Sequence, residues 1–149
     1  MIRTEAEYRE AQRRIAEGTQ ALAKERMRLE QETSSAEEVE RVLMPQRSFL
    51  MDIEEEVAFY ERLRRGEIDE LENLHGLGIM LIALRIARGL TQRQLAERLG
   101  VHESQVSRDE RNEYHGATVE RATRILDTLG VRMRSLVETP IELEPAAAE

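Results

Sequence analysis

Hydrophobic residues recur at every seventh position in the first part of the chain. Tyr8, Ile15, Leu22 and Leu29 are separated by seven residues each, and small residues lie between them. Heptad spacing of this kind predicts a helix over residues 4–31 with a narrow apolar seam, as in a coiled coil. The polar run at residues 32–35 is expected to end that helix.

A second helix is predicted to begin at Ser35, because Ser35 and Glu38 have the spacing of a capping box. Pro45 is expected to kink or split this helix, since proline lacks a backbone donor and clashes with the preceding turn. Gly66 is expected to end it. Residues 1–66 thus predict an antiparallel helical hairpin that packs on a second copy or on the rest of the chain. Its second helix carries a wide stripe made of Val39, Val42, Leu43, Gln46, Phe49, Leu50, Ile53, Val57 and Tyr60.

Shorter apolar segments separated by glycines follow a predicted linker at residues 67–76. They predict a compact bundle of about four or five helices over residues 77–137. Residues 131–137 alternate with a period of two, which fits a short strand paired with residues 141–143 or a last helical turn. The predicted fold class is therefore all-α, with that short C-terminal strand as one alternative. The bundle helices are expected at 77–88, 91–98, from His102 or Glu103 to 111, and 118–129.

Charge is distributed unevenly along the chain, whose formal net charge is −8. Residues 1–75 hold 12 Arg or Lys and 19 Asp or Glu, whereas residues 76–137 hold 10 Arg and 7 Asp or Glu. The tail at residues 138–149 holds four Glu and no basic residue. The middle segment, with a net charge of +3, is therefore the part suited to a phosphate-bearing partner.

Composition argues against several other classes of protein. The chain has no Cys, and its three His residues are far apart in the sequence, so we expect no metal site. No long apolar segment or signal peptide is evident, which predicts a soluble cytoplasmic protein without membrane contact. We find no nucleophile–base set and no phosphate-binding glycine loop, so we expect neither an enzyme nor a cofactor.

The residues that carry a specific functional signal lie at 92–111. Two short helices that cross closely need a small residue at the crossing, which Ala96 supplies. The turn between them needs a residue that tolerates a positive φ, which Gly100 supplies. The intervening positions are polar, while the positions expected to face a shared core are Leu95, Leu99, Val101 and Val106.

This segment resembles the Cro and phage-repressor (XRE) family of helix-turn-helix proteins. The resemblance covers about residues 77–137 and leaves the N-terminal half unexplained. The matching residues are Leu84, Arg85, Arg88, Gly89, Leu90, Thr91, Gln92, Leu95, Ala96, Leu99, Gly100, Val101, Ser104, Val106, Ser107, Arg108 and Glu110, followed by Val119, Ala122, Ile125, Leu126, Leu129 and Gly130.

The resemblance implies DNA-binding roles for individual residues. Gln92 is expected to contact a phosphate at a helix N-terminus, which favours anions in any case. Arg108 is expected to read guanine, and Glu103 is suited to accept from cytosine. Tyr114, His115 and Thr118 are expected to face the DNA backbone. The polar face expected in the major groove consists of Glu103, Ser104, Ser107, Arg108 and Arg111.

The remaining motif positions are expected to be structural. The resemblance implies that Arg85 and Glu110 tie the first bundle helix to the recognition helix. Asp109 departs from the family pattern, and we expect it to pair with an arginine such as Arg88 or with a neighbouring subunit. His102 precedes the recognition helix and is expected to be a poor cap.

We therefore expect a sequence-specific double-stranded DNA-binding transcriptional regulator, a dimeric repressor. The hairpin is the favoured homodimer interface, and the segment after Gly130 is the competing one. The alternative is an antitoxin that represses its own operon and binds a basic toxin through the acidic N-terminal half. A third reading is a helix-turn-helix used only as a scaffold.

Overall fold

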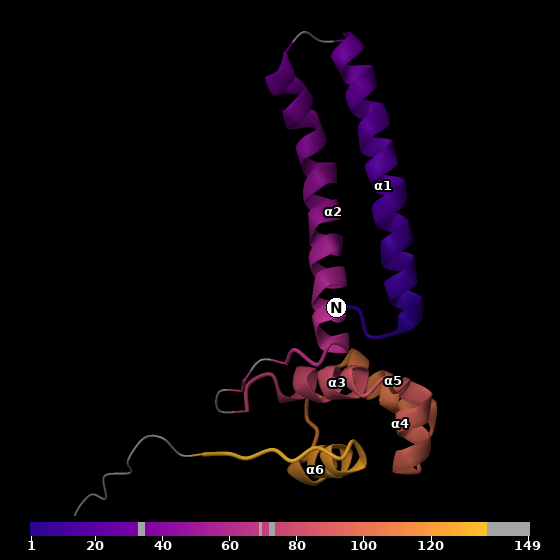
Figure 1. The fold of residues 1–149 in the computed structure, drawn as a ribbon, viewed down its shortest axis with the longest axis vertical. Helices are drawn as coiled ribbons and strands as arrows, with labels where there is room; N and C mark the ends of the chain where they lie inside the picture. Colours follow the sequence, from indigo (N-terminus) through magenta and orange to yellow (C-terminus); the bar gives the residue numbers. More distant parts are fainter. Residues whose placement is uncertain (33–34, 69, 72–73, 137–149) are drawn as a thin grey trace, which may run out of the picture.

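The computed structural model describes residues 1–32, 35–68, 70–71 and 74–136. The described residues form six helices and no strand, so the predicted all-α fold is confirmed. The two longest helices form an antiparallel hairpin that stands on a compact bundle of the four short ones (Figure 1). The helices are α1 (Glu5–Glu32), α2 (Ala36–Arg64), α3 (Leu77–Ala87), α4 (Gln92–Leu99), α5 (Glu103–Arg111) and α6 (Val119–Thr128).

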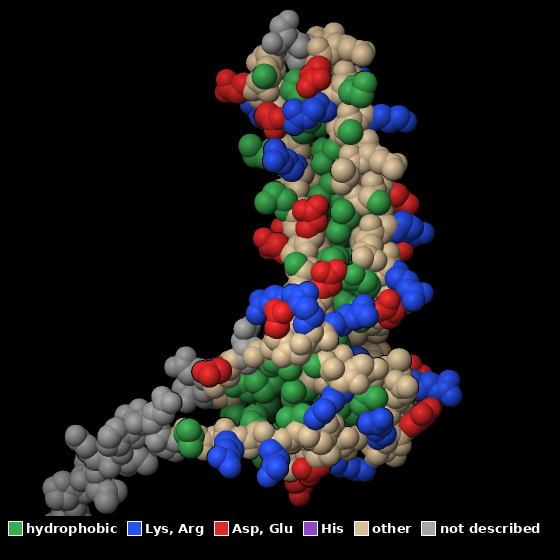
Figure 2. All heavy atoms as spheres, in the orientation of Figure 1, with side chains coloured by type: hydrophobic (Ala, Val, Ile, Leu, Met, Phe, Trp, Pro, Cys, Tyr) green, Lys and Arg blue, Asp and Glu red, His purple; other side chains and the backbone are tan. Residues whose placement is uncertain are grey.

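The two helices of the hairpin meet along an apolar seam (Figure 2). The predicted heptad residues of α1 are half-buried rather than buried; they are Tyr8, Ile15, Leu22 and Leu29. Leu43 and Leu50 of α2 are buried against α1, and Ala11 of α1 is buried as well. Figure 2 shows hydrophobic side chains along this seam and charged side chains along the outer edges of both helices. Ser35 caps α2 by accepting from the Glu38 backbone N–H at 3.3 Å.

Pro45 does not split the second helix, which was one of the two outcomes expected for it. Helix α2 continues without interruption from Ala36 to Arg64. The hydrogen bond that proline cannot donate would have gone to the Arg41 carbonyl, four residues earlier. Both Arg41 and Pro45 are solvent-exposed, so water can satisfy that carbonyl.

The bundle begins with α3, which is buried on several sides. Leu81 and Ile82 on α3 are fully buried, as are Leu95 on α4 and Ile125 on α6. The expected helices of the bundle are confirmed to within two residues at each end. Gly100 ends α4 at φ +68°, the left-handed conformation that the turn to α5 was expected to need.

The base of the hairpin shares its core with the bundle. Ile2, Tyr60 and Leu63 belong to the same buried cluster as the α3–α6 side chains. The Tyr8 and Tyr60 rings lie 5.2 Å apart, and the Tyr8 hydroxyl donates to Glu61 Oε1 at 2.6 Å. That hydrogen bond raises the pKa of the Tyr8 phenol above its ordinary value. The hairpin therefore packs on the bundle, one of the two partners that the sequence allowed.

The segment after α6 differs from its prediction. Residues 131–136 form neither a strand nor a helical turn. Position 137, the proposed partner strand at 141–143 and the rest of the acidic tail lie outside the described residues. In the part of the chain that is described, no helix is both long enough and apolar enough to cross a membrane.

Candidate nucleic-acid interface

A capping box positions the start of α4. The Thr91 hydroxyl accepts from the Gln94 N–H at 3.1 Å, and the Gln94 side chain accepts from the Thr91 N–H at 2.8 Å. Ala96, the small residue expected at the crossing with α5, is 1 % exposed. A larger side chain there would separate the two helices, so the sequence sets their close approach.

Helix α5 begins at a histidine cap. The His102 ring nitrogen Nδ1 accepts from the Ser104 N–H at 3.2 Å and lies 2.8 Å from the Ser104 hydroxyl. His102 therefore does cap the helix, with an imidazole nitrogen in place of the usual hydroxyl or carboxylate oxygen. This contact also holds Ser104 at the start of the helix.

The two sides of α5 differ sharply in exposure. Val106 is 1 % exposed and Glu110 is 0 % exposed, and both face the core of the bundle. The opposite side carries the five predicted reading residues, which we call the α5 polar face. Its members Glu103, Ser104, Arg108 and Arg111 are exposed, and Ser107 is half-buried.

A buried ion pair fixes α5 to α3. Arg85 Nε lies 2.5 Å from Glu110 Oε1, and Arg85 Nη2 lies 2.6 Å from Glu110 Oε2. Arg85 also donates to the Leu90 carbonyl at 2.7 Å and to the Arg3 carbonyl at 3.0 Å. This two-pronged geometry satisfies both charges inside the protein and sets the orientation of α5.

Gln92 lies at the start of α4 but does not point freely into solvent. Its amide nitrogen donates to Glu110 Oε2 at 2.8 Å, so its side chain joins the Arg85–Glu110 pair. The side chain that was expected to bind a phosphate is thus used inside the domain. Its backbone still lies at the N-terminus of α4, where the helix favours an anion.

Asp109 finds an intramolecular partner other than the one suggested from the sequence. It forms an ion pair with Arg121 of α6, and both side chains are only partly exposed. Arg88 instead donates to the Gly130 carbonyl at 3.0 Å. The expected arginine partner is therefore confirmed, but it is Arg121 of α6 rather than Arg88 at the end of α3.

The loop after α5 buries one residue that was expected to face DNA. Tyr114 is 7 % exposed and belongs to the shared core cluster, so its ring is removed from the proposed contacts. Burial raises the pKa of its phenol, and the charges of Glu110 and Asp109 raise it further. The backbone turns inward here at positive φ, at both Glu113 (φ 50°) and Tyr114 (φ 53°).

His115 and Thr118 remain exposed at the end of this loop. The His115 ring nitrogen Nδ1 lies 2.7 Å from the Asn112 carbonyl. Thr118 caps α6 by accepting from the Arg121 N–H at 3.2 Å. The exposed edge of the loop therefore lies beside the N-terminus of α6, a second place where backbone donors favour an anion.

Sequence reasoning missed Gly78 as a structural residue. A Cβ atom at this position would overlap the Glu113 carbonyl oxygen, so α3 approaches the loop after α5 more closely than any other residue type allows. The only signal in the sequence was a glycine inside an otherwise apolar helix, which is a weak one. Among the described residues, no three His, Asp or Glu side chains form a group that suits a metal ion.

Comparison with known proteins gives one match. Residues 81–136 match the family model described as Helix-turn-helix. No curated protein and no solved structure matches the chain. The match begins inside α3 and includes the whole α5 polar face, whereas the hairpin lies outside it.

Proposed function

Because residues 81–136 form a helix-turn-helix domain of the XRE type, a DNA-binding fold, we propose that the protein is a sequence-specific transcriptional regulator that inserts α5 into the major groove. The observation that carries this proposal is the α5 polar face. Its side chains lie on the side of α5 that faces away from the core, and the Arg85–Glu110 pair anchors the buried side of the helix to α3. A rigid helix with an exposed polar face is what major-groove reading requires.

Arg108 is the proposed base-reading residue. It is exposed and makes no ion pair among the described residues, so its planar guanidinium is available for two hydrogen bonds to one guanine. Glu103 is exposed at the first turn of α5 and suits cytosine. Ser107 and Arg111 complete the face, and Ser104 is held beside His102.

Phosphate contacts are assigned to backbone groups rather than to the Gln92 side chain. The N-termini of α4 and α6 both carry helix caps on the exposed surface, at Thr91 and Thr118. Helix N-termini bind phosphate through backbone N–H groups and the helix dipole. Such contacts would set the register of α5 on the duplex without reading sequence.

We propose that the regulator is a homodimeric repressor. One such domain reads few bases, and a two-fold dimer doubles the contacts on half-sites about 34 Å apart. The hairpin supports dimerisation because it exposes Met44 and Met51, which are 64 % and 53 % exposed. Both lie on the same side of α2, seven residues apart. The segment after Gly130 remains the competing interface.

An antitoxin is the second candidate function. The N-terminal half has a net charge of −7 and exposes large apolar side chains, as a surface that binds a basic protein would. An antitoxin would combine this surface with DNA binding by the domain. Co-purification with the product of an adjacent gene favours this candidate over a repressor that acts alone.

The decisive experiment is the selection of bound sequences from a random duplex library, with mass measurement of the selected complex. The proposal predicts a palindromic consensus and a mass of two chains per duplex. If no sequence is enriched, the domain does not read bases. A bound duplex with one chain would exclude the dimer. If the chain shows no salt-dependent DNA binding at all, the domain serves as a scaffold only.

A further inference from the structure

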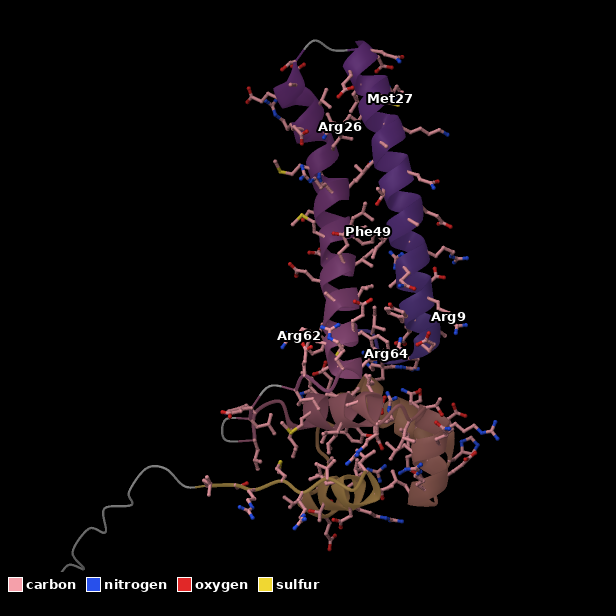
Figure 3. All side chains as sticks on the ribbon, in the orientation of Figure 1. Arg9, Arg26, Met27, Phe49, Arg62 and Arg64 are labelled. Carbon is pink, nitrogen blue, oxygen red and sulfur yellow. The ribbon has the colours of Figure 1, made fainter. Side chains whose placement is uncertain are left out.

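A groove runs along one side of the hairpin, away from the α5 polar face. It consists of two adjoining hollows of about 610 and 380 Å³, which share Arg14 and Phe49. Phe49 lies between α1 and α2 near the middle of the hairpin, while Met27 lies near its distal end (Figure 3). The groove follows α1 from Glu7 to Leu22. At 1.5 Å per residue this is about 22 Å, or four turns of a helix.

The floor of the groove is apolar and is formed by small or buried residues. Gly18 of α1 lies directly against Leu50 of α2, since a Cβ at Gly18 would approach Leu50 Cδ2 to 2.5 Å. Ala21 and Phe49 form the sides, and Phe49 is 52 % exposed. A phenyl ring left half in solvent beside an apolar floor is a surface suited to a partner.

The rim of the groove is acidic. Five carboxylates line it, and the described residues that line it supply two cations, Arg14 and the Met1 ammonium. Arg13, outside both hollows, pairs with two of the five carboxylates, Glu10 at 2.5 Å and Glu17 at 3.9 Å. Arg14 lies over the Phe49 ring at 5.2 Å, and the ammonium pairs with Glu56 at 3.0 Å. Asp52 forms no ion pair with any residue that the structure describes. The five carboxylates belong to Glu7, Glu10, Glu17, Asp52 and Glu56.

We propose that this groove binds a basic amphipathic helix of a partner protein. An apolar stripe at the i, i+3, i+4 and i+7 positions would cover Ala21 and Phe49, and flanking Lys or Arg side chains would meet the rim. The length of the groove fits about 15 residues of helix. This site rests on the hairpin alone and does not depend on α5 reading DNA.

The acidic rim favours a basic helix over the other possible occupants of the groove. A second copy docked symmetrically on the groove would bring its own acidic rim against the first, which is unfavourable. Residues 138–149 of the same chain hold four Glu and no basic residue, so they carry the same sign. DNA and an anionic membrane surface would be repelled as well.

The test uses the full chain and a fluorescein-labelled synthetic helix of 18 residues, with leucines at the stated spacing and lysines beside them. Anisotropy at about 0.15 M salt is expected to show saturable one-to-one binding. Two control peptides isolate the two features of the groove. One has glutamate in place of lysine, and the other has the same composition in scrambled order. Both are expected to bind at least tenfold more weakly.

Two matched pairs of variants locate the site. Ala21→Lys adds a bulky cation inside the groove, whereas Ala23→Lys adds the same residue to the other side of α1, outside both hollows. Phe49→Ala removes the exposed ring, and Met27→Ala truncates an exposed side chain of α1 that lies outside both hollows. We expect at least tenfold weaker binding for Ala21→Lys and Phe49→Ala, and less than a twofold change for the controls.

Three outcomes would overturn the proposal. Equal losses for Ala21→Lys and Ala23→Lys would mean that only net charge attracts the peptide. Equal binding of the glutamate or scrambled peptide would mean that the groove has no such selectivity. A dimer of the unmodified chain that Ala21→Lys alone converts to monomers would assign the groove to a second copy. Binding of Ala21→Lys to a selected duplex reports on the DNA-reading proposal separately.

Discussion

The bundle and the hairpin use the same kinds of residue in opposite ways. The bundle buries most of the apolar side chains of α3–α6 and exposes the polar face of α5. The hairpin buries a narrow seam and leaves Met27, Val42, Met44, Phe49 and Met51 exposed. The bundle, together with the base of the hairpin, therefore encloses one core and offers polar groups for recognition. The hairpin buries only its narrow seam and its base, and it leaves apolar surface exposed, which is typical of a segment that contacts another protein.

The bundle and the hairpin differ most clearly in whether their ion pairs are buried or exposed. In the bundle, Arg85 and Glu110 are buried and paired, whereas the ion pairs of the hairpin lie at the surface. Surface pairs contribute little to stability because water and salt screen them. Breaking a buried pair leaves an uncompensated charge inside the protein, which is costly.

The largest expected effect follows from that contrast. Glu110→Ala should lower the free energy of unfolding by about 3–5 kcal/mol, because Arg85 would remain buried without its partner. Glu103→Ala, on the exposed side of the same helix, should cost about 1 kcal/mol or less. Urea unfolding followed by circular dichroism measures both. If both variants lost the same free energy of unfolding, the Arg85–Glu110 pair would not anchor α5. Replacing both partners, with Arg85→Met and Glu110→Leu, should cost less than Glu110→Ala alone.

The next prediction compares the stability lost when a side chain is truncated in the buried seam of the hairpin and in its exposed groove. Leu50 is 8 % exposed and packs against Gly18, so Leu50→Ala should cost about 2–5 kcal/mol. Phe49 is its neighbour in sequence but is half in solvent, so Phe49→Ala should cost about 1 kcal/mol or less, including the contact with Arg14. Thermal unfolding of the two variants checks this. A larger loss for Phe49→Ala would show that the ring belongs to the hairpin core.

The smallest effect concerns the buried phenol of the bundle. The folded state raises the pKa of Tyr114, mainly through desolvation, so it retains a proton that the unfolded chain releases. Stability from this residue is therefore complete below the ordinary tyrosine pKa of about 10 and falls as the pH rises above it. At about pH 10.5 the loss from Tyr114 should be about 1 kcal/mol. Tyr114→Phe should remove this part of the alkaline loss and leave the part due to Tyr8 and Tyr60, whose pKa values are also raised. If urea unfolding shows the same alkaline loss in Tyr114→Phe, another group is responsible.

Much of the bundle could be predicted from the sequence because its signals are local. Thr91 and Thr118 cap helices, and Gly100 supplies the left-handed turn. These features act within a few residues, and the α3–α6 boundaries follow from them. The two sides of α5 follow equally from helical spacing, which places Val106 and Glu110 opposite the polar residues.

The sequence predictions that differ from the structure concern contacts between residues that are distant in the sequence. Asp109 of α5 pairs with Arg121 of α6, and no local sequence pattern indicates that these two side chains meet. Tyr114 is buried because the backbone takes two successive left-handed residues, which is unusual for side chains other than glycine. Ile2 and Arg3 contact the bundle from outside any periodic segment, so nothing in the spacing predicted their place.

The central claim is that the α5 polar face reads DNA, and Arg108 tests it most directly. The measurement is the affinity of Arg108→Ala for the duplex selected by the unmodified chain, compared with Arg98→Ala. Arg98 is an exposed arginine at the C-terminal end of α4, so its loss removes the same charge. We expect a loss of about 10- to 100-fold and a relaxed preference at one base pair for Arg108→Ala, and little change for Arg98→Ala. Unchanged affinity of Arg108→Ala would contradict the claim that the α5 polar face reads DNA. Equal losses of affinity in both variants, with an unaltered consensus sequence, would contradict it as well.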